Sequence, residues 1–519
     1  LFIIPILYFI TERKKIKGNG IAVIYNEPPE KGRKGNGKGQ GIKTLSTILI
    51  ACFLFTGGQK LYGEEAGKEQ GATPEIRDTQ NLSYENLLDS METNNKELAK
   101  LREEWFRSTL DTKDAKAGFQ PQIDFTVNAT YMANPLIGPI DVNVDDFIAA
   151  LPFPITPTGK TVRAYDGMDK ENYGLKLSLT QPIFTWGKIF NSVKLYSGIS
   201  QVQAARLRDQ KEKLVSQLKG SLISILYLEE IKGQLIEQKQ YADKLTGFLK
   251  SSQETGMTVE LDVMEIEVKT AELDLGISLI EQQIENLEIE LETLTGIPGL
   301  KFSRIKTAAE ETEKTIDLYK EISGTKEKAL SSERPLLEMA YGMYDVNLQA
   351  EKISKGDIYW KPDLAFQMTL GYSGSVLPFS KDWKDNDTYT ADFTVALKTI
   401  IWDGGVKLRN ITRSKSNVQS ALLDLENTKE NISRQVEKTE TSVKIQQKKL
   451  IYQEKVLEYK ELALKSQEEM YNEGYSGEAD VLKKMIEVST SKTDILETKI
   501  NLVSDILTLD YLSGNNSLQ

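Results

Sequence analysis

An internal duplication restricts the possible folds of this chain more than any other feature. Segment 173–188 (YGLKLSLTQPIFTWGK) matches segment 391–406 (ADFTVALKTIIWDGGV). The same offset pairs Gly256 with Gly474 and holds without gaps over about 120 residues. Self-similarity at one offset over this length indicates two copies of one structural unit. The fold must therefore use the same arrangement of elements twice.

Each copy shows one order of elements: a helix, two strands and a long helical hairpin. In the first copy, residues 83–298, the strands are predicted at 121–133 and 173–184 and the hairpin at 188–295. In the second copy, residues 334–514, the strands are predicted at 362–373 and 390–401 and the hairpin at 406–512. Residues 299–333 are polar and moderately helical, and we expect an equatorial-type insertion without a core of its own.

The strand segments alternate apolar and polar residues. In the first segment Ile123, Phe125 and Val127 fall on one face, and polar residues separate them. Strands of about ten residues with an apolar outer face and a polar inner face are typical of a membrane β-barrel. A soluble sheet with one solvated face has the same alternation, so the pattern alone leaves both interpretations open.

Aromatic residues at the strand ends favour the membrane interpretation. Neighbouring strands run in opposite directions, which separates the aromatic residues into two groups. The group at the helix-joined end is Trp186, Trp360 and Trp402, and the group at the loop end is Tyr131, Tyr173, Tyr372 and Tyr389. Two aromatic girdles suit the two lipid–water interfaces of a membrane.

A barrel in lipid requires more strands than one chain supplies. Four strands cannot close a barrel, and open strand edges are not tolerated in lipid. The chain must then oligomerise, and three copies would supply twelve strands. The loop 134–172 is more than twice as long as its counterpart 375–390, and its apolar residues include Phe147 and Phe153. We expect this loop to pack over the barrel mouth.

The helical segments 188–255 and 406–472 are too long for a globular core. Neither contains proline, and at about 1.5 Å per residue each spans roughly 100 Å. Leu207, Leu214 and Leu228 keep a seven-residue register, which is coiled-coil spacing. Helical hairpins of this length fit the wall of a tube or a fibrous stalk.

Residue types that are rare or missing exclude several functions. The 519 residues include no histidine, which rules out histidine-based catalysis and histidine-containing metal sites. Cys52 is the one cysteine, so no disulfide forms within the chain. A net charge of −11 disfavours nucleic acid as a partner. No motif supports catalysis by carboxylates, and we expect no enzyme activity, no cofactor and no metal site.

The N-terminal segment 1–82 has the features of a targeting region. Residues 43–63 combine a basic start with the apolar run TLSTILIACFLFTGG and are predicted to be a signal peptide. The run LIAC, which ends at Cys52, resembles a lipobox, so lipidation of Cys52 and plain cleavage near Gly63 are both open. We expect residues 1–42 to be a non-native upstream extension or disordered, residues 64–82 a linker and residues 515–519 a tail.

The ordered set of motifs resembles the TolC-like outer membrane efflux protein family. The resemblance spans about 83–514 and rests on the joints at Pro121 and Pro362, the turns QPIFTWG and IIWDGG, and the tips ETGMTVELDVM and NEGYSGEADVL. It implies a mixed α+β membrane protein, a trimer whose twelve-stranded outer-membrane β-barrel continues into a long periplasmic α-helical barrel. It further implies a passive exit duct for tripartite efflux or type I secretion. The partners would be a periplasmic adaptor (membrane fusion) protein and an inner-membrane pump of the RND, ABC or MFS type.

The resemblance also implies a gate at the hairpin tips. The tips, at Gly256 and Gly474, would form the periplasmic entrance and dock the adaptor. The Tyr471 hydroxyl would donate to Asp262, a hydrogen bond worth about 1–3 kcal/mol. The implied gate residues are Asp262, Tyr471, Gly474, Ser476, Asp480 and Lys483. Ser476 and Lys483 depart from the best-known member of the family, which has an arginine and an acidic residue there, so the network can be weaker or differently connected.

A periplasmic coiled-coil adaptor or structural protein is the alternative function. Such a protein would share the helical hairpins but would need no lipid-facing strands.

Overall fold

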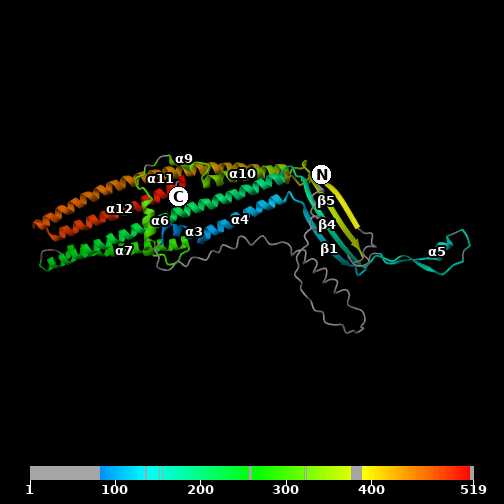
Figure 1. The fold of residues 1–519 in the computed structure, drawn as a ribbon, viewed down its shortest axis with the longest axis horizontal. Helices are drawn as coiled ribbons and strands as arrows, with labels where there is room; N and C mark the ends of the chain where they lie inside the picture. Colours follow the sequence, from blue (N-terminus) through cyan, green and yellow to red (C-terminus); the bar gives the residue numbers. More distant parts are fainter. Residues whose placement is uncertain are drawn as a thin grey trace, which may run out of the picture. The chain divides into compact units, whose positions relative to one another are not determined.

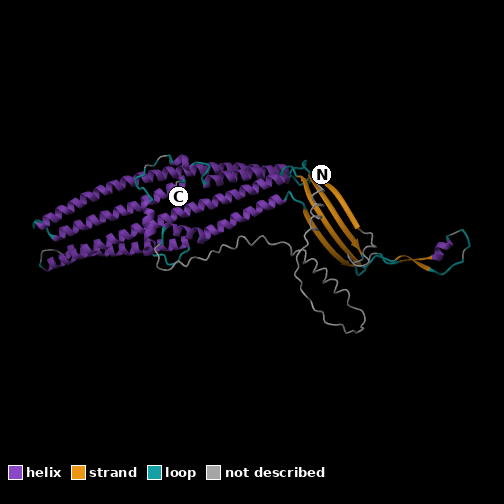
Figure 2. Cartoon of the chain, in the orientation of Figure 1, coloured by secondary structure: helices purple, strands orange, loops and turns teal. Residues whose placement is uncertain are grey.

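The computed structural model describes residues 82–514, apart from short gaps at 135–136, 151, 155, 256–259, 321, 323 and 376–388. Long helices pack side by side and continue into a β-sheet (Figure 2). The helices of the first repeat are α3 (Tyr84–Asn94), α4 (Lys96–Ala117), α6 (Lys188–Glu254) and α7 (Glu260–Thr295). Those of the second are α10 (Pro335–Gly356), α11 (Val406–Asn472) and α12 (Glu478–Ser513). The main sheet contains β1 (Gln122–Tyr131), β4 (Glu171–Phe184), β5 (Asp363–Gly374) and β6 (Tyr389–Lys398).

Corresponding helices of the two repeats have equal lengths. Helices α4 and α10 have 22 residues each, α6 and α11 have 67 each, and α7 and α12 have 36 each. The long helices begin at equivalent glycines with left-handed backbones, Gly187 at φ +77° and Gly405 at φ +83°. The single offset in the sequence therefore corresponds to one structural unit used twice.

The helices form a layer with a fixed lateral order. Helix α6 packs against α4 and α7 on one side and against α10 and α12 on the other, and α11 packs against α10 and α12. The order is thus α4 with α7, then α6, then α10 with α12, then α11 (Figure 1). The end of α6, the start of α7 and the turn between α11 and α12 lie at the end of the layer that is away from the sheet.

Burial along the helices follows this order. Helix α6, which has neighbours on both sides, buries nearly twice as many side chains as α11, which has the same length but lies at the edge. Leu218, Leu222 and Ile225 of α6 are fully buried. Each buried aliphatic side chain of this kind contributes about 1.5–3 kcal/mol. The core of the protein is therefore the stripe along α6 where the other helices meet.

The insertion between the repeats crosses the helical layer. Helix α8 (Phe302–Lys314) packs on α6, and α9 (Thr325–Ala329) packs against α11 and α12. The Tyr227 hydroxyl of α6 donates to Glu313 of α8 at 2.7 Å. Ile305 and Ala309 of α8 are completely buried against the long helices. The insertion thus contributes its apolar residues to the core of the layer.

In the single chain the long outer loop forms a small element of its own, and its expected packing over a barrel mouth stays a prediction. It contains β2 (Ile140–Asn143), α5 (Val144–Ala149) and β3 (Thr161–Tyr165), and the two strands pair antiparallel. Phe147 and Phe153 are each 69% exposed, so in the single chain they do not pack over the sheet. One sheet of four strands has no enclosed mouth, and there is no surface for this loop to cover until further copies are added.

The glycine that ends α7 provides a test of the tight packing in the first repeat. Gly296 has a φ of +71°, and a Cβ there would lie 2.7 Å from Cβ of Asn94. Gly296→Ala should lose about 1–2 kcal/mol through left-handed strain and about 1–3 kcal/mol more through overpacking against Asn94. Gly299→Ala is the matched control, because Gly299 has a φ of +69° but nothing within 4 Å. Thermal unfolding followed by circular dichroism should show the larger loss for Gly296→Ala, and equal losses would contradict the steric contribution.

Candidate functional site: the strand surfaces and the hairpin tips

The register of the main sheet collects the apolar residues of all four strands on one face. Phe125 of β1 lies opposite Leu177 of β4, which lies opposite Leu370 of β5. Met368 of β5 lies opposite Phe393 of β6. At the two edges Phe125 is 60% and Phe393 66% exposed, so this face is uncovered within one chain. An exposed apolar surface that spans four strands is expected of a sheet that meets lipid or a protein partner.

The opposite face of the same sheet is polar. Thr126 of β1 lies opposite Lys176 of β4, which lies opposite Gly371 and then Thr390 across the sheet. Every second residue faces each way in a strand, so one register sets both faces at once. The sheet therefore separates an apolar environment from a polar one.

The main sheet has two open edges. Its order is β1-β4-β5-β6, so β1 and β6 each pair with a strand on one side only. Backbone N–H and C=O groups along the outer sides of β1 and β6 have no strand partner within the described chain. Open edges of this kind are sites for strand pairing with another chain.

The aromatic residues singled out in the sequence lie at both ends of the sheet. Tyr131, Tyr173, Tyr372 and Tyr389 lie one on each strand at the end away from the helices, and the rings of Tyr372 and Tyr389 are 5.5 Å apart. Trp186, Trp360 and Trp402 lie between the strands and the helices, outside any strand. The indole N–H of Trp186 donates to the carbonyl of Pro362 at 2.8 Å. Because a strand of ten residues is about 30 Å long, the tyrosine group and the tryptophan group lie about that far apart along the strands.

An ionic cluster joins the sheet to the helices. Lys188 at the start of α6 lies 2.6 Å from Asp363 and 3.5 Å from Asp357. The buried Lys407 at the start of α11 lies 3.0 Å from the same Asp357. Asp357 therefore holds the first turns of both long helices. Asp403 caps α11. A hydrogen bond from the Tyr359 hydroxyl is the largest cause that lowers the pKa of Asp403, and hydrogen bonds from backbone N–H groups lower this pKa further.

At the second tip the turn is fixed by short-range hydrogen bonds. Gly474 has a φ of +80°, a conformation that favours glycine. The Gln467 amide donates to the Ser476 hydroxyl, which lies 3.4 Å from Asp480. Asp480 is in the first turn of α12, where a carboxylate is stabilised by the helix dipole. Lys483 is exposed on the next turn.

The structure does not bring the implied latch partners together within one chain. Tyr471 is near the end of α11 and Asp262 near the start of α7, and these helices are at opposite edges of the layer. Both side chains are exposed. Gly256 and Cys52 lie outside the described residues.

Tyr475 is an exposed residue of the second tip that the sequence patterns did not single out. This residue follows Gly474, is 82% exposed, and its backbone N–H donates to the carbonyl of Met470 at 2.8 Å. An aromatic residue directly after a left-handed glycine at a hairpin tip is the signal that could have identified it.

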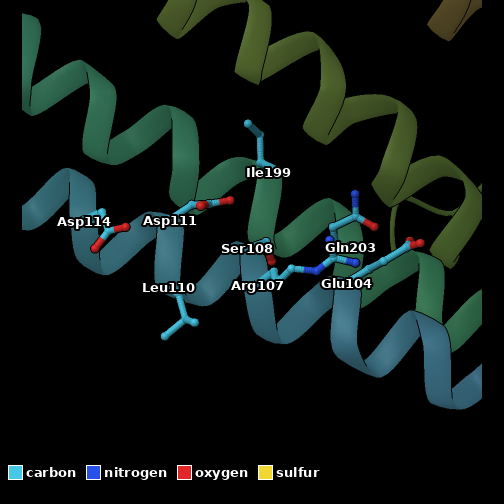
Figure 3. Close-up of a pocket in the computed structure, with 8 residues that line it drawn as sticks. All are labelled: Glu104, Arg107, Ser108, Leu110, Asp111, Asp114, Ile199 and Gln203. Atoms are coloured by element: carbon cyan, nitrogen blue, oxygen red, sulfur yellow. The ribbon is translucent and has the colours of Figure 1, made fainter. Parts of the chain in front are cut away.

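One hollow lies between α4 and α6 near the edge of the layer (Figure 3). Its wall is mostly polar, and three of its eight residues are acidic: Glu104, Arg107, Ser108, Leu110, Asp111, Asp114, Ile199 and Gln203. Among the described residues no group of three or more Cys, Asp or Glu side chains could hold a metal ion. The same part of the chain contains no helix long and apolar enough to cross a membrane.

Comparisons with known proteins agree with this architecture. Residues 87–297 match the family described as "Outer membrane efflux protein". No curated protein matches the chain significantly.

Several solved structures share the fold. CusC, studied for transmembrane channel formation, has a TM-score of 0.66 and 13% identity over 83% of this chain and 92% of its own. VceC, an outer membrane protein of Vibrio cholerae, has a TM-score of 0.64 and 15% identity over 83% and 96%. The open state of MtrE, an outer membrane channel of Neisseria gonorrhoeae, has a TM-score of 0.64 and 13% identity over 84% and 89%. The prediction of a mixed α+β fold with long helices and a four-stranded main sheet is confirmed.

The ionic cluster predicts a specific pattern of stability changes. Asp357→Ala removes the carboxylate nearest to buried Lys407, and the expected loss is about 1.5–3 kcal/mol, the usual value for a hydrogen bond to a charged group. Adding Lys407→Met should recover part of this loss, because the unpaired buried charge is then gone. Thermal unfolding of the two variants measures the recovery. A double variant that is less stable than Asp357→Ala would contradict the assigned pairing.

Proposed function

We propose that this chain, whose residues 87–297 match the outer membrane efflux protein family, is a member of that family and an outer-membrane exit duct that conducts substrates passively out of the cell. The observation that carries this function is the main sheet, with one continuous apolar face, one polar face and an aromatic group at each end. An apolar band bounded by aromatic girdles around a polar interior is the arrangement that a membrane barrel needs.

Three copies complete the barrel. Strand β1 leads away from the helices and β6 returns toward them, so β6 of one copy can pair antiparallel with β1 of the next. Twelve strands in a closed ring leave no open edge in the lipid. The helical layers, which continue from the strands, would then form a twelve-helix tube in the periplasm.

The partners follow from the position of the hairpin tips. In the proposed tube, the turn at Gly474 and the neighbouring ends of α6 and α7 would be furthest from the membrane, where a periplasmic adaptor would dock; Gly256, expected at the first tip, lies outside the described residues. An inner-membrane pump of the RND, ABC or MFS type would supply the energy, in a tripartite efflux or type I secretion system. The duct itself needs no cofactor and performs no chemistry.

The gate in this arrangement lies between copies. Around a ring, the α11 edge of one copy meets the α7 edge of the next, which brings Tyr471 toward Asp262 of a neighbour. Ser476 and Asp480 brace the turn at Gly474, and Lys483 adds a positive charge to the entrance. Several hydrogen bonds of this kind would favour a closed entrance that partner binding can open.

The lipid-facing surface can be tested with two neighbouring residues of β6. Phe393→Arg places a charge on the apolar face near the middle of the strand, where such substitutions cost about 2–4 kcal/mol in a bilayer. Thr394→Arg is the matched control on the polar face. Phe393→Arg should strongly reduce the yield of heat-modifiable trimer in outer-membrane fractions, and Thr394→Arg should leave it near the wild-type level. Equal yields, or a wild-type chain that is a water-soluble monomer, would favour the adaptor alternative.

The gate can be tested by conductance. Replacing Asp262 and Tyr471 together with Ala should raise the single-channel conductance in planar bilayers, because the closed entrance loses hydrogen bonds at every junction. Tyr475→Ala, made separately, shows whether the more exposed tyrosine of the tip contributes. Unchanged conductance of the double variant would remove Asp262 and Tyr471 from the gate.

A further inference from the structure

Helix α7 exposes an apolar stripe that no described element covers. Its buried residues, among them Val263, Leu273 and Ile284, face α6. The opposite side carries a series of exposed residues at seven-residue spacing. The apolar members of this series are Leu261, Val268, Leu275 and Ile289, and Gln282 is its polar member. A seven-residue apolar repeat is the spacing by which one helix packs against another.

Helix α11 exposes a second stripe of the same kind. Its buried residues in the half near the tip, such as Val443 and Leu450, face α12. The opposite side is exposed and carries residues spaced alternately by three and four. These residues are Ile445, Lys448, Tyr452, Lys455, Tyr459 and Leu462.

The two stripes lie at similar distances from the tips. Helix α11 ends at Asn472 and α7 begins at Glu260. Lys448 is nearly as many residues from the end of α11 as Glu285 is from the start of α7. Because both helices rise by about 1.5 Å per residue, Glu285 is roughly level with Lys448, and a long lysine side chain can approach it. Val268 and Leu462 form a second level pair, nearer to the tips.

Helix α7 is strongly acidic, and the exposed stripe of α11 carries two lysines. Helix α7 contains 11 acidic residues and one lysine, and α11 contains 13 basic and 10 acidic residues. Glu272 and Glu285 flank the α7 stripe, while Lys448 and Lys455 lie within the α11 stripe.

The charges that would meet in a ring are available for a neighbour. Within the described part of the chain, Lys448, Lys455 and Glu285 form no ion pair of their own. Lys301 lies near Glu285, but its ammonium group pairs with Glu288 at 2.7 Å. Among the described residues, Glu272 pairs only with Lys269 on the same exposed helix, at 2.9 Å. A pair this exposed contributes little and can exchange for a partner on another copy.

We propose that α7 of one copy and α11 of the next form an acid–base coiled-coil seam, which joins the copies along the half of the tube nearest the entrance. This inference rests on the proposed ring and adds how neighbouring copies recognise each other. Because the acidic stripe and the basic stripe are on opposite edges, copies associate edge to edge in one direction around the ring. Two identical edges would repel. The copies are then held together beside the entrance by a surface-exposed ionic seam, which salt and competing charged surfaces weaken.

Charge reversal on the two stripes tests the seam in the full-length protein. Lys448→Glu combined with Lys455→Glu should lower the temperature at which the oligomer dissociates in SDS by several degrees. Glu272→Lys combined with Glu285→Lys should do the same. All four changes together should restore the dissociation temperature toward that of the wild type.

Adjacent lysines provide the matched control. Lys449 is exposed like Lys448 but points about 100° away around the helix. Lys448→Glu should lower the dissociation temperature, and Lys449→Glu should leave it unchanged. Equal effects of the two single variants, or a quadruple variant no better than either double variant, would overturn the seam. A wild-type chain that forms no oligomer would instead refute the proposed ring.

Cross-linking covers the case in which a charge reversal prevents folding. In a Cys52→Ser background, Val268→Cys with Leu462→Cys should give covalent dimers and trimers with a short bis-maleimide. Each single-cysteine variant should remain monomeric on a denaturing gel. If the paired variant gives only monomers, α7 does not lie beside α11 of the neighbouring copy, and the proposal is rejected.

Discussion

Every part of this structure depends on how the main-chain hydrogen-bonding groups at the two sheet edges are satisfied. Within the described residues, β1 and β6 leave those groups without a strand partner, and a lipid environment would offer them none. In the ring proposed above, further copies supply the missing strands. The same closure would cover the exposed edges of the helical layer, since α4 and α7 continue from the side of β1 and α11 from the side of β6. One constraint on the strands would thus fix how the helical layers meet.

The sequence predicted most of the elements because their patterns are local. Alternation in QIDFTVNATY identifies β1, and the left-handed glycines Gly187 and Gly405 mark where strand gives way to helix. Proline-free segments identify α6 and α11, which end within a few residues of the predicted positions. In each case the residues that specify the element are its own.

Features that depend on distant residues were not predictable in this way. The order of the helices in the layer decides that Tyr471 and Asp262 lie at opposite edges, and no local pattern contains that order. The loop around Phe147 folds into a hairpin of its own because Asp145 accepts from the backbone of Thr158 and Gly159, at 2.6 and 2.8 Å. Its apolar residues suggested a cover for the barrel mouth, but their packing depends on surfaces that one chain does not supply.

The equal lengths of the paired helices also limit how such a protein can change size. Adding one residue to α6 would move its tip by about 1.5 Å and turn every later side chain by about 100°. The buried stripe of α6 would then rotate away from α12, and its tip would no longer be level with that of α11. Only insertions of about seven residues, made in both arms of both hairpins, keep the packing stripes aligned. In the proposed duct, the length of the tube could therefore change only in coordinated heptad steps, and the span between membrane and entrance would take discrete values.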